Sequence, residues 1–287
     1  MLFILFFAGI AISSLMHGGK LAQINDGQAD KQKMGNKRYK NLDEAVKDSK
    51  KVNILALGVE EEPRSDTMVL ISLDSESGRI DMLFIPRDTY YHEKGRDRGD
   101  QRKLNAAYGR GGGKEAKKAV ENILYPIPIH HYVALKYEGV EAIVNLLGGV
   151  EADVPKGMKG LKPGRQVLNG EQAVRFLRFR ASYPEGDLGR IKAQQQFIRS
   201  AIQKVSIPKL PIIAKKIFPY LETDISKEKM ISYAVSATKV RKENIFMHLL
   251  PGTAQYRTIN AQTWSYFFHN PQKTTKLLEL LYCVEEN

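Results

Sequence analysis

Arginine residues are concentrated in the segment 169–200, which reads NGEQAVRFLRFRASYPEGDLGRIKAQQQFIRS. Arg178 and Arg180 come where a predicted helix ends, and a turn containing proline and glycine follows. Arg190 and Gln194 are four residues apart, which places them on one face of the next helix. A guanidinium stays charged and binds two oxygens at once, which suits diphosphate. The segment therefore indicates an anion site, against the alternative of a basic helix pair facing solvent.

A second group of charged residues flanks a predicted β-hairpin. The apolar runs Thr67–Leu73 and Arg79–Ile85 are joined by the turn-forming sequence DSESG. The charged residues just before the first run and just after the second are Arg64, Asp66, Arg87 and Asp88. Because the two strands are antiparallel, these four groups should lie at one edge of the sheet. This clustering favours a site over an exposed ion pair.

Acidic residues follow the predicted strand Val52–Val59. Glu60, Glu61 and Glu62 come directly after it, and Asp66 is close behind. Carboxylates at the end of a strand, beside a fixed cation, suit a hard divalent ion such as Mg²⁺. Taken alone, the glutamate run is more typical of a solvated acidic turn.

The sequence KLNAAY contains two further candidates, Lys103 and Asn105, and Gly111–Gly113 follows it. A glycine-rich loop can bring backbone N–H groups close to phosphate. The triplet has no GK[ST] ending, so it is not a Walker-type loop, and by itself it is typical of a plain flexible connection.

The remaining pattern predicts the elements that position these residues. Strands are expected at 131–137 and 244–250, and helices at 114–124, 140–147, 170–179, 189–205 and 227–240. Strands alternating with helices predict an α/β fold, a three-layer αβα domain with a central mixed β-sheet. We expect one domain over residues 51–287.

Residues 1–16 carry no charge and are mostly apolar. As a helix they would be about 24 Å long, just short of a hydrocarbon core. We expect a transmembrane signal-anchor here and a solvated stalk over 17–50, with a buried helix and a secretory signal as alternatives. The positive-inside rule would place the lysine-rich segment 20–51 in the cytoplasm, which opposes an outward-facing domain unless a basic segment precedes the apolar run.

The chain has 44 Lys and Arg against 32 Asp and Glu, a formal net charge of +12. This excess indicates an anionic partner. The charge is not gathered in one basic arm and no convincing helix-turn-helix is present, which disfavours DNA binding. A single cysteine excludes an internal disulfide. This cysteine, Cys283, lies in a predicted apolar C-terminal helix, LLELLYCV, and His130 and His131 are interpreted as structural.

Several of these sequence blocks, in this order, resemble the LytR-CpsA-Psr family of bacterial envelope phosphotransferases. The blocks are NILALGVE (53–60), RSDTM (64–68), IPRDTY (85–90), KLNAAY (103–108), HYVALKYEGVEAIVNLLGGVEADVP (131–155), LNGEQAVRFLRFR (168–180) and GDLGRIKAQQQFI (186–198). Each block alone is weak, whereas the ordered set is specific. The apolar start followed by a stalk also fits the family's single-pass anchor.

The resemblance implies transfer of a glycopolymer, for instance teichoic acid, from an undecaprenyl-diphosphate carrier to peptidoglycan. It implies a cell-membrane protein of a Gram-positive bacterium, with the catalytic domain outside and no nucleic acid as partner. The implied metal, Mg²⁺ or Mn²⁺, has ligands matching Asp66 and Glu60, where glutamate replaces the family's aspartate. The positions implied for diphosphate binding are Arg64, Arg87, Arg178, Arg180, Arg190 and Gln194, and Lys103, Asn105 and Asp88 match further blocks.

We expect a muramyl C6 hydroxyl to attack the sugar-side phosphorus, with undecaprenyl phosphate leaving and Asp88 or Asp66 accepting the proton. The prenyl chain needs an apolar tunnel, for which Ile143–Leu147, Ala173–Leu177 and Phe197–Ile202 are candidates. Three alternatives stay open: a lipid-diphosphate hydrolase using the same site, a membrane-bound transcriptional attenuator, and a non-catalytic cell-wall-polymer binding protein.

Overall fold

The computed structural model describes residues 39–59, 64–179, 183, 187–205 and 210–284. The predicted membrane segment, most of the predicted stalk, Glu60, Glu61, Glu62 and Arg180 lie outside the described residues. Within these ranges, no helix combines the length and apolar composition needed to cross a membrane.

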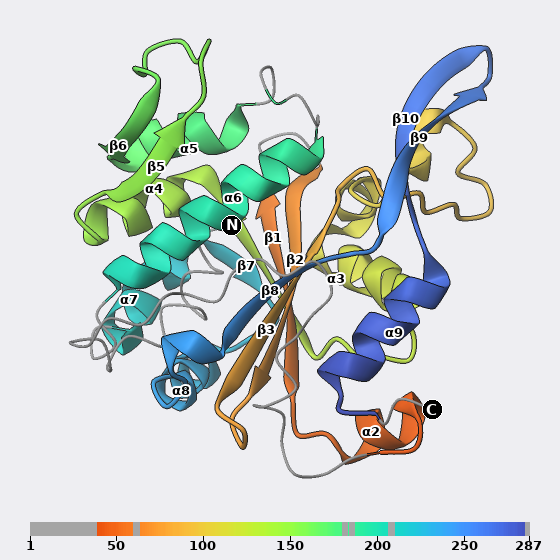
Figure 1. Ribbon diagram of the computed structural model, residues 1–287, viewed down its shortest axis with the longest axis horizontal. Coiled ribbons are helices and arrows are strands. Elements are labelled where there is room, and N and C mark those ends of the chain that lie inside the picture. The colour runs from red at the N-terminus through yellow and green to blue at the C-terminus, as the bar shows by residue number, and fades with distance from the viewer. Residues whose placement is uncertain (1–38, 60–63, 180–182, 184–186, 206–209, 285–287) are drawn as a thin grey trace.

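A six-stranded mixed sheet forms the centre of the molecule, in the order β7-β4-β1-β2-β3-β8 (Figure 1). Its strands are β1 (Val52–Val59), β2 (Ser65–Asp74), β3 (Arg79–Ile85), β4 (His131–Lys136), β7 (Leu221–Thr223) and β8 (Ile245–Leu249). Strand β2 runs antiparallel to its two neighbours β1 and β3, whereas β4 runs parallel to β1 and β8 parallel to β3. This mixed sheet confirms the predicted α/β class.

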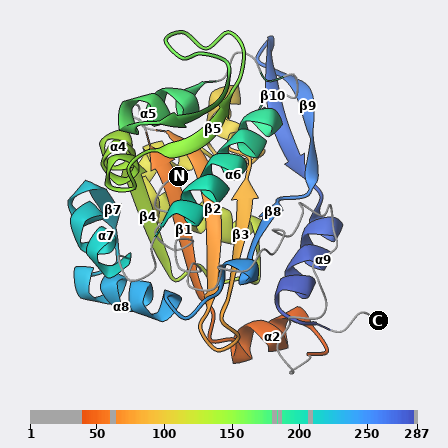
Figure 2. The ribbon, with the colours of Figure 1, turned by 60° about the vertical axis from the view of Figure 1, so that its left-hand side comes forward.

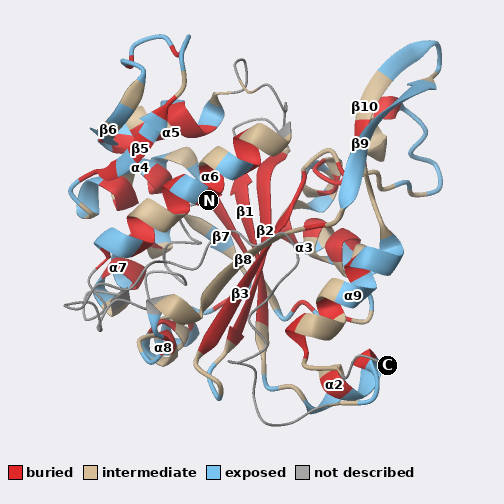
Figure 3. Cartoon of the chain, in the orientation of Figure 1, coloured by how far each residue is buried: buried red, intermediate tan, exposed pale blue. Residues whose placement is uncertain are grey.

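Helices cover both faces of the sheet, as Figures 1 and 2 show. One face carries α4 (Tyr137–Leu146), α5 (Gly170–Arg178), α6 (Asp187–Lys204), α7 (Leu210–Ile217) and α8 (Lys227–Ala237). The other carries α2 (Leu42–Asp48), α3 (Ala106–Ile123) and α9 (Pro271–Leu281). Between them, strands β1, β2 and β3 are almost completely buried (Figure 3).

The two faces bury alternate residues of the same strand, because successive side chains point to opposite sides. In β1, Ile54 and Ala56 lie in the core beneath α4–α8, and Leu55 and Leu57 lie in the core beneath α2, α3 and α9. This double burial explains why β1–β3 read as nearly continuous apolar runs.

Several helices begin at residues whose side chains cap free backbone N–H groups. Asn169 accepts from the N–H of Gln172, whose own side chain accepts from Asn169, so α5 starts with a capping box. Ser226 and Asn270 cap α8 and α9 in the same way. These caps set the helix starts close to their predicted positions.

Residues 39–50 pack against the domain. Leu42 and Ala45 of α2 are buried, and Tyr39 forms a β-bridge with Val284 after α9. The last part of the predicted stalk, residues 39–50, thus contacts the domain and includes a helix. Cys283, expected in the C-terminal helix, lies just beyond the end of α9 and is half-buried.

Two hairpins were not anticipated from the sequence. One is β5 (Val150–Val154) with β6 (Gly164–Leu168), and the other is β9 (Gly252–Ile259) with β10 (Gln262–His269). Nearly all of β9 is exposed, so it shows no alternation of apolar and polar residues. The turn between β9 and β10 has Asn260 and Ala261 at positive φ. A sequence-based prediction would look for Asn-Gly at these two positions.

Candidate anion-binding site at the ends of the central strands

The centre of the candidate site is an ion pair between Asp66 and Arg87. Met68 of β2 pairs with Ile85 of β3, and continuing this antiparallel register by two residues places Asp66 opposite Arg87. The Nη1 atom of Arg87 donates to Oδ1 of Asp66, and both side chains are largely buried, with 17% and 9% exposed. The hairpin thus brings these residues together as predicted.

Helix α6 adds Arg190 and Gln194 to this pair. Both are almost completely buried, and Nη2 of Arg190 donates to the carbonyl oxygen of Asp66 at 3.1 Å. Together with Asp66 and Arg87 they line a small cavity of about 10 Å³. A space of this size holds about one water molecule. In this conformation the site is assembled but nearly closed.

Tyr137, the first residue of α4, joins Arg178 to the same centre. Its hydroxyl donates to Oδ2 of Asp66 at 3.3 Å, and the Arg178 guanidinium lies 5.1 Å from its ring centroid. Arg178 therefore contacts the site through an aromatic ring. Sequence analysis missed Tyr137, although its position at the carboxyl end of β4, a strand parallel to β1, is where ligand-binding residues are common.

The KLNAAY segment docks against the residues that follow β3. Lys103 Nζ lies 3.0 Å from Oδ1 of Asp88, and the Asn105 N–H donates to the carbonyl oxygen of Arg87 at 3.1 Å. Asn105 is buried, and its Oδ1 accepts no hydrogen bond from the described residues. The structure thus places Asp88, Lys103 and Asn105 beside Arg87, while their roles stay predictions.

Arg64 is not among the residues that line this cavity. Its Nη2 pairs with Asp100 at 3.0 Å, and its side chain is 43% exposed. Asp100 also pairs with Arg98. Sequence alone could not place the segment that carries Asp100, so this competing carboxylate was not foreseen.

Tyr183 is a further neighbour of the site that sequence analysis missed. Burial raises the pKa of its hydroxyl, and the positive charge of Arg190 opposes this effect. The ring of Phe179 lies 6.1 Å from that of Tyr183 in an edge-on arrangement. These two aromatic residues belong to the arginine-rich segment itself, and Tyr183 lies close enough to Arg190 for its charge to act on the hydroxyl.

The predicted metal site can be examined only in part, because Glu60 lies outside the described residues. Among the described residues, no cluster of three or more His, Cys, Asp or Glu is suited to a metal ion. Asp66 supplies one carboxylate at the cavity. Protein-bound Mg²⁺ is often held by one or two carboxylates together with phosphate oxygens, so the donor type of Asp66 fits such an ion.

The glycine triplet has a different role from the phosphate loop considered above. It lies inside α3, where Gly111 and Gly112 leave helical geometry and kink the helix. The N–H of Gly113 donates to Oε1 of Glu222 in β7, and Tyr108 donates to Oε2 of the same residue. The Gly113 N–H, which was considered for phosphate binding, thus donates to a carboxylate of the protein itself.

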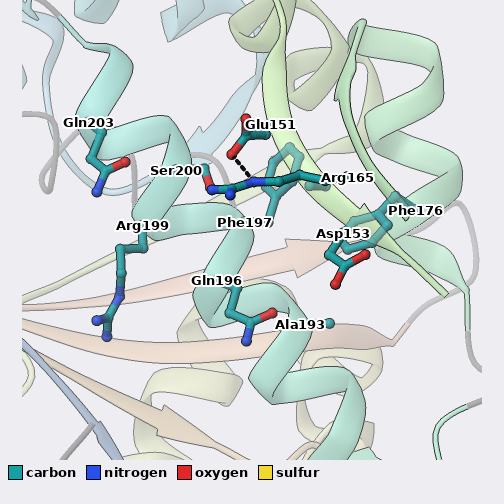
Figure 4. Close-up of a pocket in the computed structure, with 11 residues that line it drawn as sticks. Glu151, Asp153, Arg165, Phe176, Ala193, Gln196, Phe197, Arg199, Ser200 and Gln203 are labelled. Atoms are coloured by element: carbon teal, nitrogen blue, oxygen red, sulfur yellow. Dashed lines mark hydrogen bonds and ion pairs between the residues drawn. The ribbon is translucent and has the colours of Figure 1, made fainter. Parts of the chain in front are cut away.

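A larger cavity of about 370 Å³ lies between α6 and the β5–β6 hairpin (Figure 4). Phe176 and Phe197 line it, with ring centroids 5.7 Å apart. The other lining residues are mostly polar: Glu151, Asp153, Arg165, Gln196, Arg199, Ser200 and Gln203, with the smaller Ala152 and Ala193. Phe176 and Phe197 belong to the stretches considered for an apolar tunnel, and other residues of these stretches, Ile143, Ala173 and Ile202 among them, are packed in the core.

Comparison with known proteins places this geometry in context. Residues 18–281 match the LytR_cpsA_psr family. A polyisoprenyl-teichoic acid–peptidoglycan teichoic acid transferase, TagV of Bacillus subtilis (strain 168), is 35% identical over 223 residues, covering 70% of this chain and 56% of TagV. A TagU of the same description from Oceanobacillus iheyensis is 34% identical, covering 71% of this chain and 66% of TagU. This chain thus matches less than two thirds of the length of either.

The solved structure of B. subtilis TagV has the same fold. It superposes with a TM-score of 0.67 and 29% sequence identity, covering 83% of this chain and 99% of that one. The family match extends over most of the chain, and it includes every strand of the central sheet and all residues that line the small cavity. The chain therefore belongs to the LytR-CpsA-Psr family.

Proposed function

We propose that this protein is an enzyme that transfers an anionic glycopolymer, teichoic acid or a similar polymer, from an undecaprenyl-diphosphate carrier to peptidoglycan. The observation that carries the proposal is the cluster of Arg87, Arg190 and Asp66 at the strand ends. The relatives named as teichoic acid transferases support the substrate class.

The cluster suits phosphoryl transfer because its cations are fixed in advance. Negative charge develops on the transferred phosphoryl group and on the leaving phosphate, and preorganised donors stabilise that charge most effectively in a site shielded from water. Arg87 is held by Asp66, and Arg190 is held by the backbone of the same residue. Neither arginine has to be ordered when the substrate binds.

In the proposed reaction, a hydroxyl group of peptidoglycan, the muramyl C6 hydroxyl, attacks the sugar-side phosphorus. A new P–O bond forms, and the bond to undecaprenyl phosphate breaks with its electron pair leaving on that phosphate. The hydroxyl proton passes to a carboxylate. Asp88 is the better placed acceptor, because both oxygens of Asp66 already accept hydrogen bonds, from Arg87 and Tyr137.

We further propose Mg²⁺, or Mn²⁺, as the cofactor, with Asp66 as one ligand and Glu60, or its neighbours Glu61 and Glu62, as the other. When bound, the ion neutralises charge on the diphosphate. The uncharged run at residues 1–16 supports a single-pass anchor in the cell membrane. The proposed extracellular side of the domain is supported by the peptidoglycan acceptor that the relatives' names give.

The proposal is tested with purified protein, Mg²⁺, an undecaprenyl-diphosphate-linked glycopolymer and peptidoglycan. Arg87→Ala should reduce peptidoglycan-linked product about 10²–10³-fold, as loss of a preorganised transition-state donor does. The matched control is Arg175→Ala, which removes an exposed arginine paired with Glu171 on α5.

Three results would contradict the proposal. Equal transfer by Arg87→Ala and Arg175→Ala would show that the arginine cluster is not the site of transfer. Release of free phosphate products with no linked polymer would identify a hydrolase, and salt-sensitive DNA binding without transfer would favour the attenuator.

A further inference from the structure

The β9–β10 hairpin, residues 252–269, stands away from the body of the protein as an arm (Figures 1 and 2). Residues 252–258 are all exposed, and β10 becomes buried only at Tyr266 and Phe267. An exposed two-stranded hairpin is marginally stable by itself in water. Its persistence here therefore depends on the contacts made at its base.

The composition of this arm differs from that of the rest of the chain. Arg257 is its single charged residue and it has no carboxylate, whereas 26% of the whole chain is charged. Hydroxyl and amide side chains predominate instead: Thr253, Gln255, Thr258, Asn260, Gln262, Thr263 and Ser265. Such side chains complement an uncharged partner rich in hydroxyl and amide groups, and they offer little to a strongly ionic one.

The strand register sorts these side chains onto two faces. Tyr256 pairs with Ser265 and Thr258 pairs with Thr263, so these four residues share one face. On that face the Tyr256 side chain is 78% exposed. It therefore presents an aromatic ring flanked by hydroxyl groups. A tyrosine ring supplies a rigid amphipathic contact surface at low entropic cost.

The opposite face of the arm is fixed against the body. The ring centroid of Tyr90 lies 5.3 Å from that of Tyr266 and 5.0 Å from that of Phe268. Arg257 lies 4.4 Å from the Phe268 ring, and the Tyr266 hydroxyl donates to the carbonyl oxygen of Gly99. These contacts leave the face that carries Tyr256 turned outward.

The base of the arm is continuous with the candidate site. The Phe267 N–H donates to the carbonyl oxygen of Asp88 at 2.9 Å, and the Tyr90 N–H donates to that of Phe267 at 2.8 Å. Lys103 contacts both regions, because its Nζ pairs with Asp88 and lies 6.0 Å from the Trp264 ring. The end of the arm nearest the body is therefore hydrogen-bonded to the backbone of Asp88 in the candidate site.

We propose that the arm binds the acceptor, a glycan strand of peptidoglycan, with Tyr256 stacking on a sugar ring. Sugar rings carry hydroxyl and acetamido groups, the chemistry that the arm complements. An eight-residue strand spans about 26 Å, long enough for several rings. This inference rests on the proposed function, and it assigns the acceptor to a surface separate from the arginine cluster.

The chain contains one tryptophan, Trp264, and it lies in the arm, so fluorescence reports directly on this segment. Teichoic-acid-free glycan strands are titrated into the purified protein while Trp264 emission is recorded, and sedimentation with insoluble peptidoglycan gives a second measure of binding. Tyr256→Ala should raise the Kd for glycan about tenfold. In transfer assays it should raise KM for the acceptor and leave kcat nearly unchanged.

The control is Tyr220→Ala, which removes an exposed tyrosine beyond α7, and it should bind glycan as the wild type does. A double variant, Thr258→Ala with Thr263→Ala, tests the hydroxyl contacts without removing the ring. Equal glycan affinity in wild type and in both arm variants would overturn the proposal. So would a dimer, seen by analytical ultracentrifugation without glycan, that Tyr256→Ala dissociates, because a second copy would then occupy the arm.

The same experiments separate this inference from the proposed function. If glycan binding depends on Tyr256 but transfer does not depend on Arg87, the glycan-binding role of the arm is supported and the assignment of the arginine cluster as the active site is contradicted. If transfer depends on Arg87 but not on Tyr256, and Tyr256→Ala leaves glycan affinity unchanged, the site assignment is supported and the glycan-binding role of the arm is contradicted.

Discussion

Two arginine–aspartate pairs lie at opposite ends of β3, and they differ in how completely they are satisfied. At the start of the strand, Arg79 binds Asp81 through two hydrogen bonds of 2.8 Å, with both side chains at most 5% exposed. His248 contacts the same aspartate, and the ring of Phe246 covers the guanidinium. Just past its other end, Arg87 holds Asp66 beside a cavity that Arg190 also lines.

The difference separates a structural pair from a candidate site. At Asp81 both carboxylate oxygens are held by neighbouring side chains, those of Arg79 and His248. At the cavity beside Asp66, two arginines, Arg87 and Arg190, face the single carboxylate of Asp66. An arginine–aspartate pair can therefore either stabilise a fold or form part of a binding site. The neighbouring side chains and the presence of a cavity distinguish the two cases.

The largest expected effect is on stability, from Arg79→Ala. Removing one partner of a buried pair leaves an uncompensated charge, so the free energy of unfolding should fall by about 3–5 kcal/mol. Urea denaturation measures this decrease in the free energy of unfolding. The control is Arg165→Ala, whose pair with Glu151 is exposed and should change stability by less than about 1 kcal/mol. Similar losses in both variants would erase the distinction between buried and exposed pairs.

A smaller effect, on catalysis, is expected from Arg190→Lys. Lysine keeps the charge but loses the planar fork, so transfer should fall about 10–100-fold while the melting temperature changes little. Arg165→Lys serves as the surface control. If Arg190→Lys retained full transfer but lost stability, Arg190 would belong with Arg79 as a structural residue.

The acid dependence of stability tests the Asp81 pair separately. Arg79 and His248 hold the pKa of Asp81 below its ordinary value, against the opposing effect of burial. A depressed pKa in the folded state gives stability that is present above the unfolded pKa, near 3.9, and is lost as pH falls toward the folded value. The stability gap between wild type and Asp81→Asn should thus be full at pH 7 and narrow below about pH 4. Unfolding curves across this range that keep a constant gap would contradict the assignment.

The smallest expected effect comes from Tyr137→Phe. This change removes the 3.3 Å hydrogen bond to Asp66 but keeps the ring beside Arg178. One such bond contributes about 1 kcal/mol, so transfer should fall about fivefold. Tyr91→Phe, which removes a 3.2 Å bond to Glu93 away from the cavity, should leave transfer unchanged. A loss as large as that of Arg87→Ala would instead give the Tyr137 hydroxyl a direct part in the reaction.

The sequence could predict those parts of the fold whose burial leaves a clear pattern. Strands β1–β3 follow from apolar runs, and their hairpin register brings Asp66 opposite Arg87. The arm was missed because its exposed strand carries no such pattern, and the kink in α3 was mistaken for a loop. Arg64 was assigned to diphosphate, but its pair with Asp100 depends on a tertiary contact that spacing does not reveal.

The position of Glu222 in an edge strand affects whether the central sheet can pair with another chain. Strand β7 forms an edge of the sheet and is only three residues long. The carboxylate of its middle residue is held by Tyr108 and by the kink of α3. A short edge strand that carries an anchored charge is a poor template for another chain. The kinked helix thus holds a charge in place at an open sheet edge, which disfavours pairing of that edge with a second copy of the protein.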